Sequence, residues 1–400
     1  MEENAFDIIK RGCVEIIEEE ELRVRLKNGG QKGKELRVKC GFDPSAPDIH
    51  LGHYILLKKL RDFQDLGHKV LLLIGDFTGM IGDPSGQIST RRALTKEEVR
   101  ENARTYERQV FKVLRRDRTE IVFNSEWLGK LSPYDIVNLC GKWTVARMLE
   151  REDFKMRYQS RKPISIHEFL YPLFQAYDSV ALNADVEVGG ADQKFNFMIT
   201  REIQKEFGQP PEVVLTLPLL EGLDGKKKMS KSCGNYIGIE EPPDEVFGKL
   251  MSIPDFLITK YMFLLTSLPE DKIKKIEKEM ADGLLNPRDA KMELAFEVTS
   301  ILHGEESARK ARKRFEKVFS MRELPEEMEE FCISLENELW LPRVLKELKV
   351  LPSTSEGIRM AQQGGIDVNG VKISSDYRIR EKGIYIVKIG KRRFIRLKVI

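Results

Sequence analysis

The stretch KCGFDPSAPDIHLGHYILLKKL, residues 39–60, decides the fold. The apolar run Leu36–Cys40 predicts a strand, and the two prolines after it predict a loop, because proline fits neither a strand nor a helix interior. The segment HLGH then opens a helix over about 52–66, which Gly67 closes. The same order of strand, loop and helix recurs along the first half of the chain.

Short apolar runs alternate with amphipathic segments as far as residue 217. The amphipathic segments predict helices over about 52–66, 165–179 and 193–207, and one that opens at Thr95 with Glu98 completing a capping box. This alternation predicts an α/β fold with a parallel sheet wound by helices on both faces, which binds ligands at the carboxyl ends of its strands. The predicted strands are Leu36–Cys40, Val70–Ile74, Ile121–Asn124, Val186–Val188 and Val213–Leu217.

The composition sets limits on the class of protein. The chain has 400 residues, of which 41% are hydrophobic and 33% charged, so we expect two or three folded domains. We expect no membrane span, because no uncharged apolar stretch is long enough, and no secretory signal in MEENAFDIIKRG. The five cysteines form no C-x-x-C pair, which argues against a metal site or disulfide framework and favours the reducing cytoplasm.

The second half of the chain changes character after about residue 240. Strand signals give way to helical spacing, and Asn286-Pro287 is typical of a helix start. The acidic segment Glu323–Glu336 predicts a linker or a short helix. Beyond it, Asn369-Gly370 lies between two short apolar runs, which predicts a tight hairpin, and the alternating runs IYIVKIG and RFIRLKVI predict further strands.

Charge is unevenly distributed along the chain. Residues 341–400 carry 14 Lys and Arg against 5 Asp and Glu, whereas the whole chain has a net charge of only +3. A basic terminal module on an acidic body favours a nucleic-acid partner, since contacts to phosphate supply affinity independent of sequence. The alternative is a solvated basic tail without a partner.

Two motifs carry the candidate chemistry. His50 and His53 stand at the start of a helix, where unpaired N–H groups favour phosphate, and Gly52 between them lets a flat ring lie on the backbone. The loop GLDGKKKMSKSCGN clusters lysines between glycines, which predicts a mobile cationic clamp for a polyphosphate. The alternatives are two helix-cap histidines without chemistry and a solvated basic loop.

Together the two motifs resemble the class I aminoacyl-tRNA synthetases. The stretches CGFDPSAPDIHLGH, IGDFTGMIGDPSG, YPLFQAYDS, VGGADQKFN and KMSKS resemble, within that class, the tyrosyl-tRNA synthetase family. The resemblance implies a Rossmann-like catalytic domain over 1–237, a helical anticodon-binding domain over 238–330 and a small α+β, S4-like RNA-binding domain over 338–400. It also implies ATP with its Mg²⁺, L-tyrosine and tRNA(Tyr) as substrates, and no resident metal.

The resemblance assigns roles to individual residues. Lys228, Lys231 and Ser232 are expected to close over the departing pyrophosphate, and Asp192 to hold the ribose. Tyr171, Gln175 and Asp178 share one helix face by their spacing, and the family's match to Asp178 accepts from the phenol. The expected ATP contacts are Cys40, Ser45, His50, Gly52, His53, Asp192 and Lys231. The expected tyrosine contacts are Gly41, Asp83, Tyr171, Gln175, Asp178 and Gln193.

Position 39 departs from the family pattern. Many members carry tyrosine where this chain has Lys39, so Lys39 is expected either to pair with Asp178 or to point away along the strand. The inserted segment 112–162 matches the region that forms a homodimer contact in the family. Its large side chains Trp127, Trp143, Met148 and Phe154 fit such a contact or a buried core, and Arg147 and Arg151 are candidates to touch the tRNA acceptor stem.

The basic module completes the expected activity. Residues 353–363 predict a helix ended by two glycines, and the module is expected to bind RNA by phosphate and shape. Three alternatives remain open: a synthetase-like RNA-binding protein without ligase activity, a tryptophan–tRNA ligase, and a small nucleotidyltransferase. The basic side chains proposed to contact RNA are Arg359, Lys372, Arg378 and Arg380.

Overall fold

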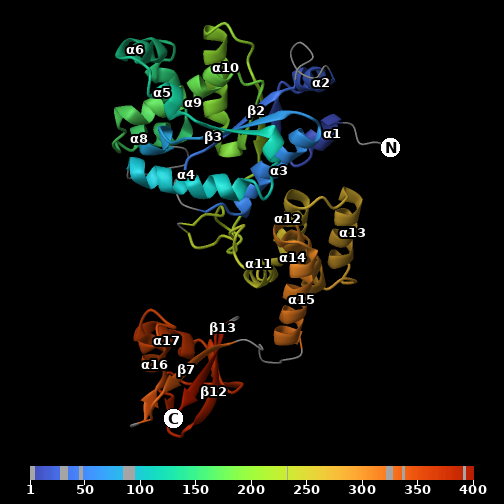
Figure 1. Ribbon diagram of the computed structural model, residues 1–400, viewed down its shortest axis with the longest axis vertical. Helices are drawn as coiled ribbons and strands as arrows, with labels where there is room; N and C mark the ends of the chain where they lie inside the picture. The colour runs from blue at the N-terminus through green and yellow to red at the C-terminus, as the bar shows by residue number, and fades with distance from the viewer. Residues whose placement is uncertain are drawn as a thin grey trace. The chain divides into compact units, whose positions relative to one another are not determined.

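The computed structural model describes residues 5–27, 35–44, 48–83, 95–231, 233–320, 328–335, 338–390 and 393–400. The chain forms two compact units, Met1–Glu305 and Glu306–Ile400. Figure 1 labels their helices and strands. In the described part of the chain no helix is long and apolar enough to cross a membrane.

A six-stranded sheet organises the first unit. Its strands run in the order β1-β6-β5-β2-β3-β4, and all pair in parallel except β1, which is antiparallel to β6. The five predicted strands are confirmed, and the three-residue β1 was missed because it is too short to carry a pattern. The strands are β1 (Glu15–Ile17), β2 (Arg37–Phe42), β3 (Lys69–Ile74), β4 (Thr119–Phe123), β5 (Val186–Gly190) and β6 (Val213–Leu217).

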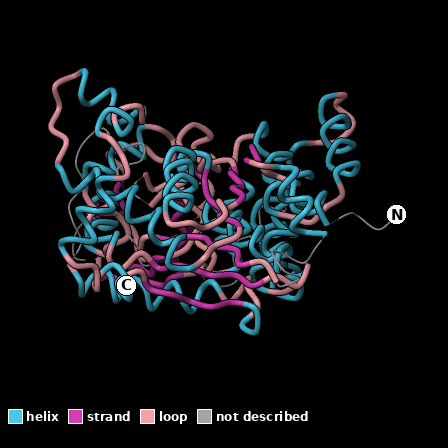
Figure 2. Tube along the Cα trace, turned by 90° about the horizontal axis from the view of Figure 1, so that it is seen from above, coloured by secondary structure: helices cyan, strands magenta, loops and turns pink. Residues whose placement is uncertain are grey.

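Helices cover both sides of this sheet (Figures 1 and 2). The capping box at Thr95 and Glu98 is confirmed, and the helix before Gly67 ends where that residue takes a φ of +93°. The order of strands switches between β5 and β2, which is where an α/β sheet opens a binding crevice. The helices are α1 (Ala5–Lys10), α2 (Glu19–Lys27), α3 (Leu51–Asp65), α4 (Lys96–Val110), α5 (Ser125–Leu128), α6 (Pro133–Gly141), α7 (Val145–Met148), α8 (Glu152–Gln159), α9 (Ile166–Leu182) and α10 (Lys194–Glu206).

Four further helices complete the first unit. They are α11 (Pro243–Met251), α12 (Ile258–Leu265), α13 (Glu270–Ala281) and α14 (Pro287–His303). The predicted start of α14 is confirmed, because the Asn286 side chain caps the helix and Pro287 is its first residue. These helices and the sheet belong to one compact unit, so a domain boundary near residue 238 stays a prediction.

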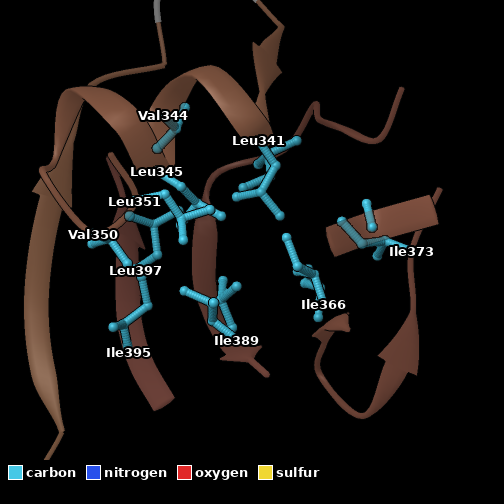
Figure 3. Close-up of a cluster of buried hydrophobic side chains, with 14 of the residues drawn as sticks. Leu341, Val344, Leu345, Val350, Leu351, Ile366, Ile373, Ile389, Ile395 and Leu397 are labelled. Carbon is cyan, nitrogen blue, oxygen red and sulfur yellow. The ribbon is translucent and has the colours of Figure 1, made fainter. Parts of the chain in front are cut away.

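The second unit contains α15 (Glu305–Ser320) and a small α+β module. A sheet in the order β10-β9-β12-β13-β7 is accompanied by the pair β11-β8. Apolar side chains from the helix α16 and from β9, β12 and β13 point toward one another in its core (Figure 3). The elements are β7 (Glu329–Ile333), β8 (Leu339–Trp340), α16 (Leu341–Glu347), α17 (Thr354–Gln362), β9 (Ile366–Val368), β10 (Val371–Lys372), β11 (Arg378–Ile379), β12 (Gly383–Ile389) and β13 (Arg393–Val399).

Two expectations for this module have different outcomes. The hairpin is confirmed, since Asn369 and Gly370 both adopt a positive φ between β9 and β10. The prediction of a linker or short helix over Glu323–Glu336 is wrong for the part that forms β7, because this part is a strand that pairs in parallel with β13. Its acidic residues suit a strand because Glu329 binds Arg393 at 2.7 Å across the ladder. Residues 321–327 and 336–337 lie outside the described residues.

Candidate active site

A cavity of about 480 Å³ opens at the carboxyl ends of the parallel strands. It is lined by residues from β2, β5, α3, α9 and the loop after β6, so segments far apart in the sequence meet there. Ser45 and Ser232 lie outside the described residues. The predicted residues that line the cavity are Gly41, His50, Gly52, His53, Asp83, Tyr171, Gln175, Asp178, Asp192, Gln193, Lys228 and Lys231.

The two imidazoles lie against each other at the start of α3, with their ring planes tilted by 36°. Their ring centroids are 3.9 Å apart. His50 Nδ1 accepts the backbone N–H of Gly52 at 3.1 Å, and His53 Nδ1 accepts that of His50 at 3.3 Å. Each ring therefore carries its proton on Nε2 when neutral. Burial, reinforced by neighbouring cations, lowers the pKa of His50 to about 2 and that of His53 to about 4. Both are uncharged hydrogen-bond donors near neutral pH.

Gly52 makes room for this arrangement. A Cβ at this position would stand 3.0 Å from two atoms of the His50 ring. The flat ring expected over this glycine is therefore, in this conformation, the imidazole of His50 itself. A side chain at position 52 would push that imidazole away from the helix start.

The lysine loop lies against the same side of the cavity. Lys231 Nζ binds Asp48 Oδ2 at 2.7 Å, and Lys228 Nζ binds Asp192 Oδ2 at 3.3 Å. Just after the loop, the chain pairs with the histidine motif through a β-bridge between His50 and Gly238. Imidazoles and ammonium groups thus converge on one space, as the sequence predicted, and an entering polyphosphate can take the place of the two carboxylates as partner of the lysines.

Polar side chains at the α9 end of the cavity are held by hydrogen bonds to one another. Asn196 donates from Nδ2 to Gln175 Oε1 at 2.8 Å and to Gln193 Oε1 at 3.1 Å. Gln193 Nε2 in turn donates to Asp83 Oδ2 at 2.6 Å. The hydroxyl of Tyr171 donates to a carboxylate, Asp43 Oδ2, at 2.7 Å. Acceptor oxygens held in this way suit a substrate ammonium group.

Asp178 lies at the buried floor of this end. Only 1% of its surface is exposed, and it accepts from Trp127 Nε1 at 2.7 Å and Asn124 Nδ2 at 3.2 Å. Burial raises the pKa of Asp178 to about 7, although the Lys39 ammonium and the two donors pull it down. The carboxyl group therefore changes charge close to physiological pH.

Lys39 follows neither of the two courses expected for it. Its ammonium pairs with Glu187 Oε1 at 2.9 Å rather than with Asp178, and it points into the domain rather than away. The two residues are register partners on the neighbouring strands β2 and β5. Both are almost fully buried, and a buried lysine requires a close counter-charge.

Two more expectations are corrected by burial. Cys40 is fully buried and does not line the cavity, because successive side chains of a strand point to opposite faces and its neighbours Lys39 and Gly41 line it. Arg151 is only 5% exposed, so it does not present itself to an acceptor stem. Its guanidinium binds both carboxylate oxygens of Asp153, at 2.7 and 3.1 Å, and donates to Asn196 Oδ1 at 3.0 Å.

The inserted segment contains both buried and exposed apolar side chains. Of the two readings left open for its four large side chains, the buried core is the one found: Met148 and Phe154 are buried, and Trp127 and Trp143 pack against the same cluster. Arg147 is exposed and stacks on the Trp143 ring at 3.8 Å. A different set of apolar side chains in and beside the segment is exposed: Tyr134, Val137, Val145, Met156, Tyr158 and Ile166.

The basic residues of the second unit lie at its surface. Arg359 binds Glu356 at 2.7 Å, and Arg380 and Arg378 approach Glu338 at 3.1 and 3.8 Å. All are solvent-accessible pairs, which contribute little to folding and leave the cations open to other anions. Lys372 is also exposed.

Sequence reasoning missed five polar residues that build the site. Asp43, Thr78 and Asn196 stand within the motifs CGFDP, IGDFTGMIGDPSG and VGGADQKFN and could have been found there. Asn124 and Trp127 lie outside the quoted motifs and are brought in by the fold. They are Asp43, Thr78, Asn124, Trp127 and Asn196.

The chain is similar to known proteins in both sequence and fold. Residues 31–320 match the family described as "tRNA synthetases class I (W and Y)". The chain is 53% identical to the tyrosine–tRNA ligase of Thermotoga maritima and 52% identical to that of Desulfotalea psychrophila, over 99% of this chain and 97% and 98% of theirs. A solved tyrosyl-tRNA synthetase from Archaeoglobus fulgidus, in complex with L-tyrosine, aligns with a TM-score of 0.61 and 28% identity over 77% of this chain and 98% of its own.

Proposed function

Because this chain belongs to the class I tRNA synthetases of the tryptophan and tyrosine group and acts as a tyrosine–tRNA ligase, we propose that its cavity holds ATP and tyrosine side by side. The observation that carries the proposal is the meeting of the histidine pair, the lysine loop and the polar face of α9 around one space. ATP with its Mg²⁺ occupies the histidine and lysine end, and tyrosine occupies the α9 end.

The first chemical step joins the two substrates. A carboxylate oxygen of tyrosine attacks the α-phosphorus of ATP, the bond to the bridging oxygen of the β-phosphate breaks, and pyrophosphate leaves. His50 and His53 donate from Nε2 to phosphate oxygens as charge builds on them. Lys228 and Lys231 leave their carboxylate partners and close over the departing pyrophosphate, while Asp192, released by Lys228, accepts from the ribose.

The α9 end selects and orients the amino acid. The oxygens of Asp83, Tyr171 and Gln175 receive the ammonium group, and Gln193 lies beside the carboxylate that reacts. Asp178 accepts from the phenol hydroxyl. Since covalent participation of the protein is not needed, positioning and charge stabilisation carry the rate.

The second step moves the tyrosyl group to the terminal ribose of tRNA(Tyr). The helices after residue 238 are proposed to bind the anticodon arm, and Arg359, Lys372, Arg378 and Arg380 to bind RNA phosphates. A homodimer is proposed through the exposed apolar side chains of the inserted segment, among them Tyr134 and Ile166 at 86% and 81% exposure. The cytoplasmic location remains a prediction from the cysteine pattern.

An exchange assay tests the proposed tyrosine site. Radioactive pyrophosphate should enter ATP in the presence of tyrosine and not of tryptophan or phenylalanine. Gln175→Ala should raise the KM for tyrosine about ten-fold, as expected for one lost hydrogen bond, with little effect on the KM for ATP. Gln209→Ala, a change outside the cavity, is the matched control. An unchanged tyrosine KM in Gln175→Ala would overturn the assignment of the α9 end.

A further inference from the structure

A cluster of three buried ionisable groups lies beneath the tyrosine end of the cavity. Lys39 and Glu187 are each 1% exposed and line the cavity floor, and Glu212 behind them is fully buried. Burial alone lowers the pKa of Lys39, but the surrounding carboxyl groups more than reverse this and keep it charged. Burial and the nearby Glu187 raise the pKa of Glu212 well above its ordinary value, which favours the protonated form of that carboxyl group.

The ammonium of Lys39 has no N–H left for a substrate. It pairs with Glu187 Oε1 at 2.9 Å, donates to Ser179 Oγ at 2.7 Å and donates to the backbone carbonyl of Gln175 at 3.2 Å. An ammonium group has three protons, and these three partners use all of them. A direct contact between Lys39 and the phenol of tyrosine is therefore not available without breaking this arrangement.

Two partners of Lys39 flank, along α9, the residue proposed to bind the phenol hydroxyl. Gln175 and Ser179 are one helical turn apart on α9, and Asp178 lies between them. Lys39 thus joins the strand β2 to the turn of helix that carries Asp178, and it also places a positive charge near that carboxylate. Glu187, in the same cluster, places a negative charge there.

We propose that Lys39 is a positioning residue for tyrosine selection: it holds the turn of α9 that bears Asp178 and favours the charged form of that carboxylate, while Glu187 acts on it in the opposite direction. This inference rests on the proposed role of Asp178. An ionised carboxylate in a buried site disfavours phenylalanine because that substrate brings no hydroxyl to donate to it, whereas a neutral carboxyl group loses most of that penalty. Selection for tyrosine thus depends on a charge that Lys39 maintains.

The two charges make predictions of opposite sign. Lys39 is the largest influence that lowers the pKa of Asp178, and Glu187 is a smaller one that raises it. Removing Lys39 should therefore move the ionisation of Asp178 to higher pH even if Glu187 becomes protonated, and removing Glu187 should move it to lower pH. The other ionisable groups nearby are Glu212 before β6, Tyr171 on α9, Asp43 after β2 and Asp83 after β3.

The test compares Lys39→Met and Glu187→Gln with the unaltered enzyme. The pH profile of kcat/KM for tyrosine, measured by pyrophosphate exchange, reports ionisations of the free enzyme. Its acidic limb should move up by about one pH unit or more in Lys39→Met, the scale of a lost close charge, and down in Glu187→Gln. The preference for tyrosine over phenylalanine at neutral pH should fall in Lys39→Met.

Two control variants separate the explanations. Lys59→Met removes another buried lysine, paired with Asp62 at 2.9 Å outside the cavity, and should leave the limb in place. Asp178→Asn should abolish the limb. If it does not, the proposed role of Asp178 fails. If Asp178→Asn abolishes the limb, but Lys39→Met and Glu187→Gln leave the limb unmoved or shift it in the same direction, the inference fails. Should Lys39→Met not fold by circular dichroism, a limb that does not move down in Glu187→Gln overturns the inference.

Discussion

Replacing Trp127 by phenylalanine should shift the pH at which the enzyme begins to use tyrosine. Trp127 Nε1 donates to Asp178 Oδ1 at 2.7 Å, and phenylalanine keeps a ring but has no donor. A hydrogen bond to a charged group contributes about 1.5–3 kcal/mol, and one pKa unit corresponds to about 1.4 kcal/mol, so the pKa of Asp178 should rise by about one to two units. Starting from about 7, it would move to roughly 8–9.

The consequence for activity follows from the fraction of ionised Asp178. The raised pKa means that the carboxylate form is present above the new value and lost as the pH falls through it. At pH 7.5, kcat/KM for tyrosine should therefore drop roughly three- to twenty-five-fold, and it should recover above about pH 9. The profile is measured by tyrosine-dependent pyrophosphate exchange between about pH 6 and 9.5, the range that brackets both expected pKa values.

Trp143→Phe provides the matched control. Trp143 packs against the same apolar cluster, but its Nε1 has no hydrogen-bond partner among the described residues. It should leave the acidic limb where it is. An unmoved limb in Trp127→Phe, or an equal shift in Trp143→Phe, would refute the reasoning, because the effect would then come from packing or not exist.

Three further outcomes are expected. Lys231→Ala should slow adenylate formation about 10²–10³-fold in rapid-quench measurements, the effect of losing one preorganised donor, with little change in tyrosine affinity. Loss of tyrosine binding with an unchanged rate would contradict the proposed pyrophosphate clamp. The charge-neutral double change Arg151→Met/Asp153→Asn removes the hydrogen bond that holds Asn196, so it should raise the KM for tyrosine and leave the KM for tRNA unaltered. A raised KM for tRNA with an unaltered KM for tyrosine would instead indicate that Arg151 contacts RNA. Removing residues 328–400 deletes the whole sheet of the second unit, including β7, which pairs with β13. This deletion should spare pyrophosphate exchange but weaken tRNA charging and flatten its salt dependence. Undiminished charging would argue against RNA binding by this module.

Much of the fold could be predicted because its signals are local. The five core strands were recognisable as short apolar runs, and the hairpin at Asn369-Gly370 follows from the backbone angles those residues tolerate. The acidic strand β7 could not be predicted, because its glutamates are stabilised by cations on β13 more than 60 residues later in the chain. Only pairing makes such a segment a strand.

The candidate site divides in the same way. The two motifs around His50 and Lys231 could be recognised from the sequence, since residue type and spacing at a helix start and in a glycine-flanked loop are properties of short segments. The ion pairs and the directions of the side chains are properties of the folded chain. Lys39 pairs with Glu187, and Cys40 lies on the face of its strand that does not line the cavity. Burial makes those choices, because a charge removed from water requires a partner that only the packing of distant strands can bring to it.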